Sequence, residues 1–345
     1  SVSRGLGDVY KRQVGDDVEA SLDELEELAE TAGAETVAKV IQNREAVHPG
    51  TYIGKGKIEE VASLLRALDA NGVICDDELS PAQLNNLERE LDCKVMDRTL
   101  LILDIFAGRA VSSEGKIQVE LAQLRYRAAR LVGLRESLSR LGGGIGTRGP
   151  GEKKLETDRR LIRTRISALK AELAQVEKHR ELIRGKRSRG NLKTAAIVGY
   201  TNAGKSTLLN TLTGAGILAE DKLFATLDPT TRVLELKDGQ QILLTDTVGF
   251  IRKLPHHLVE AFKSTLEEAK YADYIIHVVD ASNPQAELQM FTVYETLREL
   301  GATGKKIVTL LNKQDQVTGS GIRDLKADYT VKCSARTGEG LDEFC

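Results

Sequence analysis

The sequence contains no tryptophan, and aromatic residues make up only 4% of its 345 residues. Proteins that bind single-stranded nucleic acid by base stacking depend on aromatic faces, so this scarcity argues against that class. Cysteine is also rare, and the four residues show neither a C-x-x-C pair nor the spacing of metal ligands. This pattern predicts reduced thiols in the cytosol rather than disulfides or a zinc site.

Long apolar runs are missing as well. No stretch of the sequence approaches the roughly 20 apolar residues that cross a bilayer. The N-terminus also lacks the charged and apolar pattern of a secretion signal. We expect a cytoplasmic, monomeric protein with no membrane span.

The two ends of the chain look unlike the rest. Residues 1–13 show no hydrophobic periodicity and resemble a translated sequencing adaptor. We therefore exclude them from the fold as a non-native tail and expect them to be disordered. At the other end, the chain stops at Cys345, just as residues 341–344 begin to follow a helical pattern. We expect a fragment whose last domain is truncated.

Helical and strand-like patterns alternate between residues 14 and 111. Ser21 is expected to cap the first helix, and Ser80 followed by Pro81 is expected to open the third. Helices are predicted at residues 21–32, 58–68 and 100–106, and a further helix is predicted to begin at residue 80. Strands are predicted at residues 36–41, 72–75 and 94–96. This alternation predicts a small α/β subdomain.

Residues 112–190 have the pattern of two long helices, with apolar residues in steps of three, four and seven. Each helix has a narrow apolar seam, so the two are predicted to pack together as an antiparallel hairpin. Between them lies a loop at residues 142–151, which contains six glycines in ten positions. A turn between helices needs fewer residues, so the loop is interpreted either as an adaptable tip that enters a partner or as a flexible linker.

This hairpin segment is strongly basic. It contains 20 Lys and Arg residues against 9 Asp and Glu, although the net charge of the whole chain is −2. Such a block favours a polyanionic partner. The alternative interpretation is a solvated, charged helical face. A short basic linker, residues 185–190, then leads into a domain that covers residues 191–345.

That last domain opens with a phosphate-binding motif. An apolar strand precedes the motif G-x-x-x-x-G-K-[ST], and a helical pattern follows it. In such a loop the glycines let backbone N–H groups approach phosphates. Lys205 is expected to reach the β- and γ-phosphates, and Ser206 to ligate Mg²⁺. The predicted phosphate-binding residues are Gly199, Tyr200, Thr201, Asn202, Ala203, Gly204, Lys205, Ser206 and Thr207.

Three further motifs indicate that the nucleotide is a guanine nucleotide. Asp246 and Gly249 form D-x-x-G after an apolar strand, where Asp246 would hold Mg²⁺ through water and Gly249 would contact the γ-phosphate. Asn312, Lys313 and Asp315 form N-K-x-D, whose carboxylate accepts hydrogen bonds from a pair of donors that guanine presents and adenine lacks. The third motif, similar to S-A-K, is Ser334, Ala335 and Arg336. This order predicts GTP as substrate on a doubly wound α/β sheet.

The segment between the first two motifs lies where switch I of a GTPase belongs. Thr226 is our first candidate for the Mg²⁺ ligand of switch I, and Thr230 is the second. We expect the catalytic residues to be Thr226, Lys205 and Gly249. Phe250 follows D-x-x-G, where GTPases of the Ras type carry a water-orienting Gln, so slow intrinsic turnover is expected. His256 and His257 are interpreted as a surface or helix-start feature rather than as catalytic groups.

The whole pattern resembles the HflX family of GTPases. The resemblance rests on residues 246–251 and 261–268 for switch II, 224–232 for switch I, 115–124 and 148–160 for a helical subdomain, and 48–57 for an N-terminal subdomain. It implies a GTPase that binds the large ribosomal subunit through the hairpin and loop 142–151. The resemblance further implies a role in rescue or dissociation of stalled ribosomes under stress.

Two other functions remain open at this point. One is a GTP-gated module for RNA binding or ribosome assembly that scarcely hydrolyses GTP without its partner, which Phe250 favours. The other is a tRNA-modifying or membrane-transport GTPase, which would need a modification domain or membrane helices that the sequence lacks.

Overall fold

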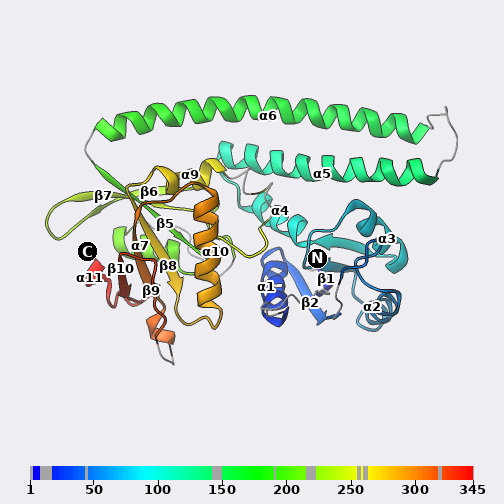
Figure 1. Ribbon diagram of the computed structural model, residues 1–345, viewed down its shortest axis with the longest axis horizontal. Helices are drawn as coiled ribbons and strands as arrows, with labels where there is room; N and C mark the ends of the chain where they lie inside the picture. The colour runs from blue at the N-terminus through cyan, green and yellow to red at the C-terminus, as the bar shows by residue number, and fades with distance from the viewer. Residues whose placement is uncertain are drawn as a thin grey trace. The chain divides into compact units, whose positions relative to one another are not determined.

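The computed structural model describes residues 3–7, 18–42, 46–141, 150–189, 192–214, 223–254, 258, 263–317 and 321–344 (Figure 1). The chain divides into two compact units. The first comprises residues 1–108 and 119–172, and the second comprises residues 109–118 and 173–345. Each contains a β-sheet that is wholly or mainly parallel, which confirms the predicted α/β class.

The first unit is built on a four-stranded parallel sheet in the order β2-β1-β3-β4. Its strands are β1 (Ser3–Gly7), β2 (Ala34–Lys39), β3 (Gly72–Cys75) and β4 (Lys94–Asp97). The helices of this region are α1 (Val18–Thr31), α2 (Lys55–Ala67), α3 (Pro81–Leu91) and α4 (Arg98–Arg109). A core of buried aliphatic side chains from α2, α3 and the strands fixes this layer.

The expectation of disorder at the N-terminus is wrong for Ser3–Gly7. This segment forms β1, which lies between β2 and β3 and pairs with both in parallel. Parallel pairing uses main-chain N–H and C=O groups, so a strand can form without the alternating side-chain pattern that sequence reasoning requires. The remaining residues of the tail lie outside the described residues.

The two predicted helix starts in this unit have different outcomes. Ser80 caps α3 as expected: its hydroxyl accepts from Gln83 N (3.2 Å), and Gln83 Oε1 accepts from Ser80 N (2.9 Å). Ser21, by contrast, is not a cap, because α1 begins three residues earlier at Val18. Ser21 is instead buried inside the helix, where its hydroxyl donates to Asp76 (2.7 Å).

Helices α5 (Ser113–Leu141) and α6 (Pro150–Arg189) form the predicted antiparallel hairpin. Within the first unit, Arg165 binds both carboxylate oxygens of Glu120, at 2.7 and 2.8 Å. Within the second unit, Arg180 pairs with Glu114 at 2.8 Å. Going along α5 from Glu114 to Glu120, the partner on α6 changes from Arg180 back to Arg165, as expected for antiparallel helices. No helix in the described part of the chain is both apolar and long enough to cross a membrane.

The ends of α6 differ from the sequence prediction. Residues 142–149 of the glycine-rich loop lie outside the described residues, but Pro150 and Gly151 belong to α6 rather than to the loop. Proline suits the first position of a helix, because its missing N–H would have no partner there. Most of the predicted linker is also helical, since α6 continues to Arg189.

The second unit contains a six-stranded sheet in the order β10-β9-β8-β5-β7-β6, in which only the β6–β7 pair is antiparallel. Its strands are β5 (Lys193–Gly199), β6 (Thr230–Glu235), β7 (Gln241–Asp246), β8 (Tyr274–Asp280), β9 (Lys306–Asn312) and β10 (Tyr329–Lys332). Its helices include α7 (Lys205–Thr213), α9 (Lys263–Tyr271), α10 (Ala286–Glu299) and α11 (Leu341–Phe344).

Helices α7 and α10 pack on opposite faces of this sheet. Leu208 of α7 packs in one cluster with Val278 and Leu310, whereas Met290 of α10 packs in another with their neighbours in the strands. Successive residues of a strand point to opposite faces, so the two helices enclose the sheet. The carboxyl ends of β5, β7 and β9 all lie at the same edge, and each of the first three nucleotide motifs begins there.

Candidate nucleotide-binding site

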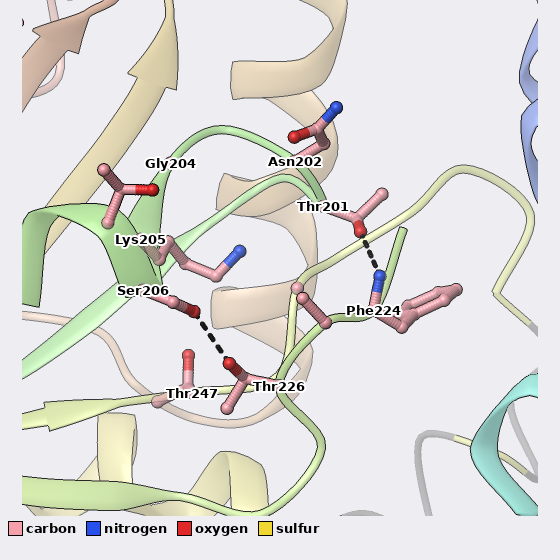
Figure 2. A pocket seen from close by; sticks show the side chains of 11 residues that line it. Thr201, Asn202, Gly204, Lys205, Ser206, Phe224, Thr226 and Thr247 are labelled. Atoms are coloured by element: carbon pink, nitrogen blue, oxygen red, sulfur yellow. Dashed lines mark hydrogen bonds between the residues drawn. The ribbon is translucent and has the colours of Figure 1, made fainter. Parts of the chain in front are cut away.

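The loop between β5 and α7 forms one wall of a pocket (Figure 2). Two of its glycines are required by close contacts. A Cβ atom at Gly199 would lie 2.3 Å from the carbonyl oxygen of Val278, and one at Gly204 would lie 2.3 Å from Asn312 Nδ2. Gly204 also has a positive φ of 96°, a backbone conformation that residues other than glycine rarely adopt. The loop therefore packs its main chain directly against neighbouring segments.

Lys205 begins α7 and points into this pocket. Its side chain is buried, and its ammonium group donates to the carbonyl oxygen of Tyr200 at 2.8 Å. Burial lowers the pKa of Lys205 to about 8, and the charge of Asp246 partly opposes that shift. A buried cation beside backbone N–H groups is suited to binding phosphate.

Three oxygen-bearing side chains meet next to Lys205. Ser206 Oγ lies 2.7 Å from Thr226 Oγ1 and 2.8 Å from Asp246 Oδ2, and the Ser206–Thr226 contact is drawn in Figure 2. Burial raises the pKa of Asp246, while Lys205 and the hydroxyl donors act in the opposite direction. The second oxygen, Asp246 Oδ1, is buried and has no hydrogen-bond partner among the described residues. Hydroxyl and carboxylate oxygens fit Mg²⁺.

The structure separates the two threonines that the sequence leaves open. Thr226 lies beside Ser206, whereas Thr230 is the first residue of β6 and pairs with Asp246 across the antiparallel ladder. The next residue, Thr231, lies 2.9 Å from Thr245 between their hydroxyl oxygens. Thr230 is thus a strand residue, and Thr226 lines the pocket.

The D-x-x-G segment lies against the phosphate-binding loop. A Cβ atom at Gly249 would lie 2.7 Å from the Cα of Thr201 and 3.0 Å from Lys205 Nζ. Phe250 donates its N–H to Gly199 O (3.1 Å) and accepts from Thr201 N (2.7 Å). The Phe250 side chain is buried and is not among the described residues that line the pocket. It therefore offers no group to orient water there.

One contact of the loop was missed by the sequence analysis. Thr201 Oγ1 accepts a hydrogen bond from the backbone N–H of Phe224 at 2.8 Å, as Figure 2 shows. Phe224 is buried and has a positive φ of 55°, which is uncommon for a bulky residue. This strained aromatic residue fixes switch I two residues before Thr226. In the sequence, only the resemblance of residues 224–232 to switch I indicates that Phe224 belongs near the site.

At the base-reading motif, Asn312 links three segments. Its Nδ2 donates to Ala203 O (2.9 Å), and its Oδ1 accepts from Ala335 N (2.8 Å). The donor to Asn312 Oδ1 is thus the backbone amide in the middle of the third motif. The phosphate-binding loop and both guanine motifs are thereby joined by one side chain.

The other residues of these motifs surround Asn312. Lys313 has a positive φ of 60° and pairs with Asp280 at 2.8 Å. Asp315 is exposed, and a hydrogen bond from the Ser334 side chain, aided by the charge of Arg336, lowers its pKa. An ionised, accessible carboxylate is what recognition of two guanine donors requires.

Some of the remaining residues that we predicted for the site line the pocket, and others do not. Asn202 and Thr207 line the pocket. Tyr200 is buried, and its hydroxyl accepts a hydrogen bond from Arg252 N at 2.8 Å, so its contribution to the site is the carbonyl that binds Lys205. His256 and His257 lie outside the described residues.

Comparison with known proteins agrees with this geometry. Three family models match the chain: GTP-binding GTPase N-terminal at residues 19–107, GTP-binding GTPase Middle Region at residues 109–187, and 50S ribosome-binding GTPase at residues 194–313. The GTPase HflX of Lacrimispora saccharolytica is 72% identical over 330 residues, which cover 95% of this chain and 78% of that protein. The chain belongs to the HflX family of GTPases.

Other similar proteins are more distant. The GTPase HflX of Escherichia coli is 47% identical over 94% of this chain and 77% of its own length. The crystal structure of SsGBP in complex with GDP covers 100% of this chain and 96% of its own, with a TM-score of 0.55 and 28% identity. The chain is therefore a GTP hydrolase with a P-loop, and its substrate is GTP.

Proposed function

We propose that this chain is a Mg²⁺-dependent GTPase that binds the large ribosomal subunit in the cytoplasm and takes part in the rescue or dissociation of stalled ribosomes under stress. The observation that carries the catalytic part is the meeting of Ser206, Thr226 and Asp246 beside Lys205. Ser206 and Thr226 would bind Mg²⁺ directly, and Asp246 would hold it through water. Bound there, Mg²⁺ would neutralise charge on the β- and γ-phosphates of GTP.

The side chains and main chain of the site have complementary roles in this proposal. Lys205 would place its ammonium on the β- and γ-phosphates, exchanging its bond to Tyr200 for them. Gly249 would direct its N–H to the γ-phosphate, where charge develops during transfer to water. Asn312 would hold the motifs in register, while Asp315 accepts hydrogen bonds from guanine.

The ribosomal part of the proposal is supported by the surface of α6. A hollow on this helix is lined by three arginines, three hydroxyl side chains and one carboxylate: Arg159, Arg160, Arg163, Thr157, Thr164, Ser167 and Glu156. Arginine forks and hydroxyls bind the phosphates of RNA without reading its sequence. The family model for the last domain is described as a 50S ribosome-binding GTPase. We propose a monomer that contacts ribosomal RNA through α5, α6 and loop 142–151.

The decisive experiment measures GTP turnover by the full chain with and without purified large ribosomal subunits. We expect stimulation by the subunits, loss of turnover in Lys205→Ala, and weaker binding as salt rises. Substituting Arg159, Arg160 and Arg163 together by Glu should abolish stimulation while leaving basal turnover intact. Equal turnover with and without subunits would contradict the ribosomal assignment.

One observation favours a second function, a GTP-gated RNA-binding module with negligible hydrolysis of its own. Phe250 is buried at the position that orients water in GTPases of the Ras type. A partner would then have to supply the missing group. Single-turnover measurements distinguish the two, because the module would bind RNA in a GTP-dependent manner yet show no hydrolysis alone.

A further inference from the structure

Switch I is tied to the first turn of helix α5. Asp228 Oδ2 accepts hydrogen bonds from the backbone N–H groups of Val111 (3.0 Å) and Ser112 (2.9 Å), and Asp228 Oδ1 accepts from the Ser112 hydroxyl. These residues all belong to the second unit. Charge-assisted bonds are about twice as strong as neutral ones. The helix dipole also favours a carboxylate at this end, so the contact is a firm one.

Ser112 is the N-terminal cap of α5. Its hydroxyl accepts from Gly115 N (2.9 Å), and its carbonyl oxygen accepts from Lys116 N (3.0 Å). In a capping box, the side chain three residues after the cap accepts the N–H of the cap residue. Here that position is Gly115, which has no side chain. Asp228 supplies the missing carboxylate from a distant segment.

Gly115 also makes room for this arrangement. A Cβ atom at Gly115 would lie 2.5 Å from Asp228 Oδ1 and 3.2 Å from Ser112 Oγ. Glycine is among the poorest helix formers, so its presence in the first turn of a long helix needs a packing reason. The close approach of Asp228 supplies that reason.

We propose that Asp228 is a positioning residue for GTP hydrolysis, which holds switch I on α5 so that Thr226 stays at Ser206 and Asp246. Thr226 lies two positions before Asp228, and the segment between Phe224 and β6 has no helix or strand of its own to fix it. Leu227, between them, is buried, which limits rotation of the segment. This inference rests on the proposed Mg²⁺-dependent reaction, in which the Thr226 hydroxyl binds the metal.

The test uses two substitutions that disturb the contact from opposite sides. Asp228→Asn keeps the size of the side chain but removes its charge and one acceptor. Gly115→Ala places a methyl group where the carboxylate lies. The matched control is Gly56→Ala, because Gly56 also lies in the first turn of a helix and a Cβ atom there would meet nothing within 4 Å.

Both variants should lower kcat for GTP roughly tenfold, the effect expected from losing a hydrogen bond to a charged group. The KM for GTP and the affinity for GDP should stay near the wild-type values, because the phosphate loop and the guanine motifs are untouched. The Mg²⁺ concentration needed for half-maximal binding of a non-hydrolysable GTP analogue should rise by a similar factor. A merely structural role for Asp228 would leave that Mg²⁺ dependence unchanged.

Wild-type kcat and Mg²⁺ dependence in both variants would overturn the proposal, as would an equal loss in Gly56→Ala. Failure of the proposed Mg²⁺-dependent reaction gives a different result, in which turnover by the unaltered chain itself does not change with the Mg²⁺ concentration. A shifted Mg²⁺ dependence in the two variants, beside a normal dependence in the unaltered chain, supports the positioning role of Asp228.

Discussion

The side-chain oxygens of Ser206 and Thr226 lie 2.7 Å apart, although 20 positions separate the two residues in the sequence. This contact places switch I directly on the start of α7. Since Ser206 also contacts Asp246, one hydroxyl connects the phosphate-binding loop with switch I and with the end of β7. The proposed Mg²⁺-binding part of the nucleotide site is therefore assembled from three segments that meet at a single serine.

Substituting Thr226 tests its role. Thr226→Ala should lower GTP turnover by about ten- to a hundredfold, because the hydroxyl that would complete the metal site is lost. Thr230→Ala is the matched control, since Thr230 belongs to β6, and it should stay within about twofold of wild type. Turnover at several Mg²⁺ concentrations is the measurement. A larger loss in Thr230→Ala would return the metal ligand to Thr230.

Substituting Gly204 tests the close packing of the phosphate-binding loop. Gly204→Ala should weaken GTP binding at least about a hundredfold, because the new methyl group would displace Asn312 and the backbone has a positive φ. Gly239→Ala is the control: it has a similar φ of 80°, but a Cβ atom there meets nothing within 4 Å. It should cost about 1 kcal/mol of stability without changing GTP affinity. Fluorescent-nucleotide titration and thermal unfolding report the two effects.

GTP binding should take up protons in alkaline solution. The pKa of Lys205 is lowered to about 8, so above that pH the free protein carries a neutral amine. Bound phosphate favours the ammonium form and raises the pKa, so binding near pH 9 should take up most of one proton per GTP. Calorimetry in two buffers of different ionisation enthalpy measures this uptake. Equal uptake at pH 7.5 and pH 9 would show that Lys205 does not titrate in this range.

Asp315 should determine the choice of base. Asp315→Asn replaces a two-acceptor carboxylate with an amide that carries one acceptor and one donor, which no longer matches the two donors of guanine. Affinity for GTP should fall by about a hundredfold or more, and affinity for XTP, whose ring carries an additional oxygen acceptor, should rise. Competition between the two nucleotides is the measurement. Unchanged preference for GTP would remove Asp315 from the guanine site.

The order of the motifs predicted which strand ends meet at the candidate nucleotide site. Each of Gly199, Asp246 and Asn312 ends an apolar strand, and parallel strands bring their carboxyl ends to one edge. The sequence could not separate Thr226 from Thr230, because both precede or begin a strand in a segment without periodicity. That distinction depends on where β6 starts, and boundaries are the least certain part of a sequence-based prediction.

Other features left no local signal at all. Strand β1 is held by main-chain pairing with two neighbours, so its side chains carry no pattern that would reveal it. The contact between Asp228 and Ser112 joins residues 116 positions apart. A glycine in the first turn of α5 is visible in the sequence, but its reason becomes clear only when the carboxylate beside it is known.

Helix α5 has 29 residues and begins at the turn that Asp228 caps. At 1.5 Å per residue such a helix is about 43 Å long, yet its start is held by one carboxylate of switch I. A rearrangement of switch I would withdraw that carboxylate and leave the N–H groups of Val111 and Ser112 without their acceptor. The start of the longest element before the glycine-rich loop would then loosen whenever switch I moves.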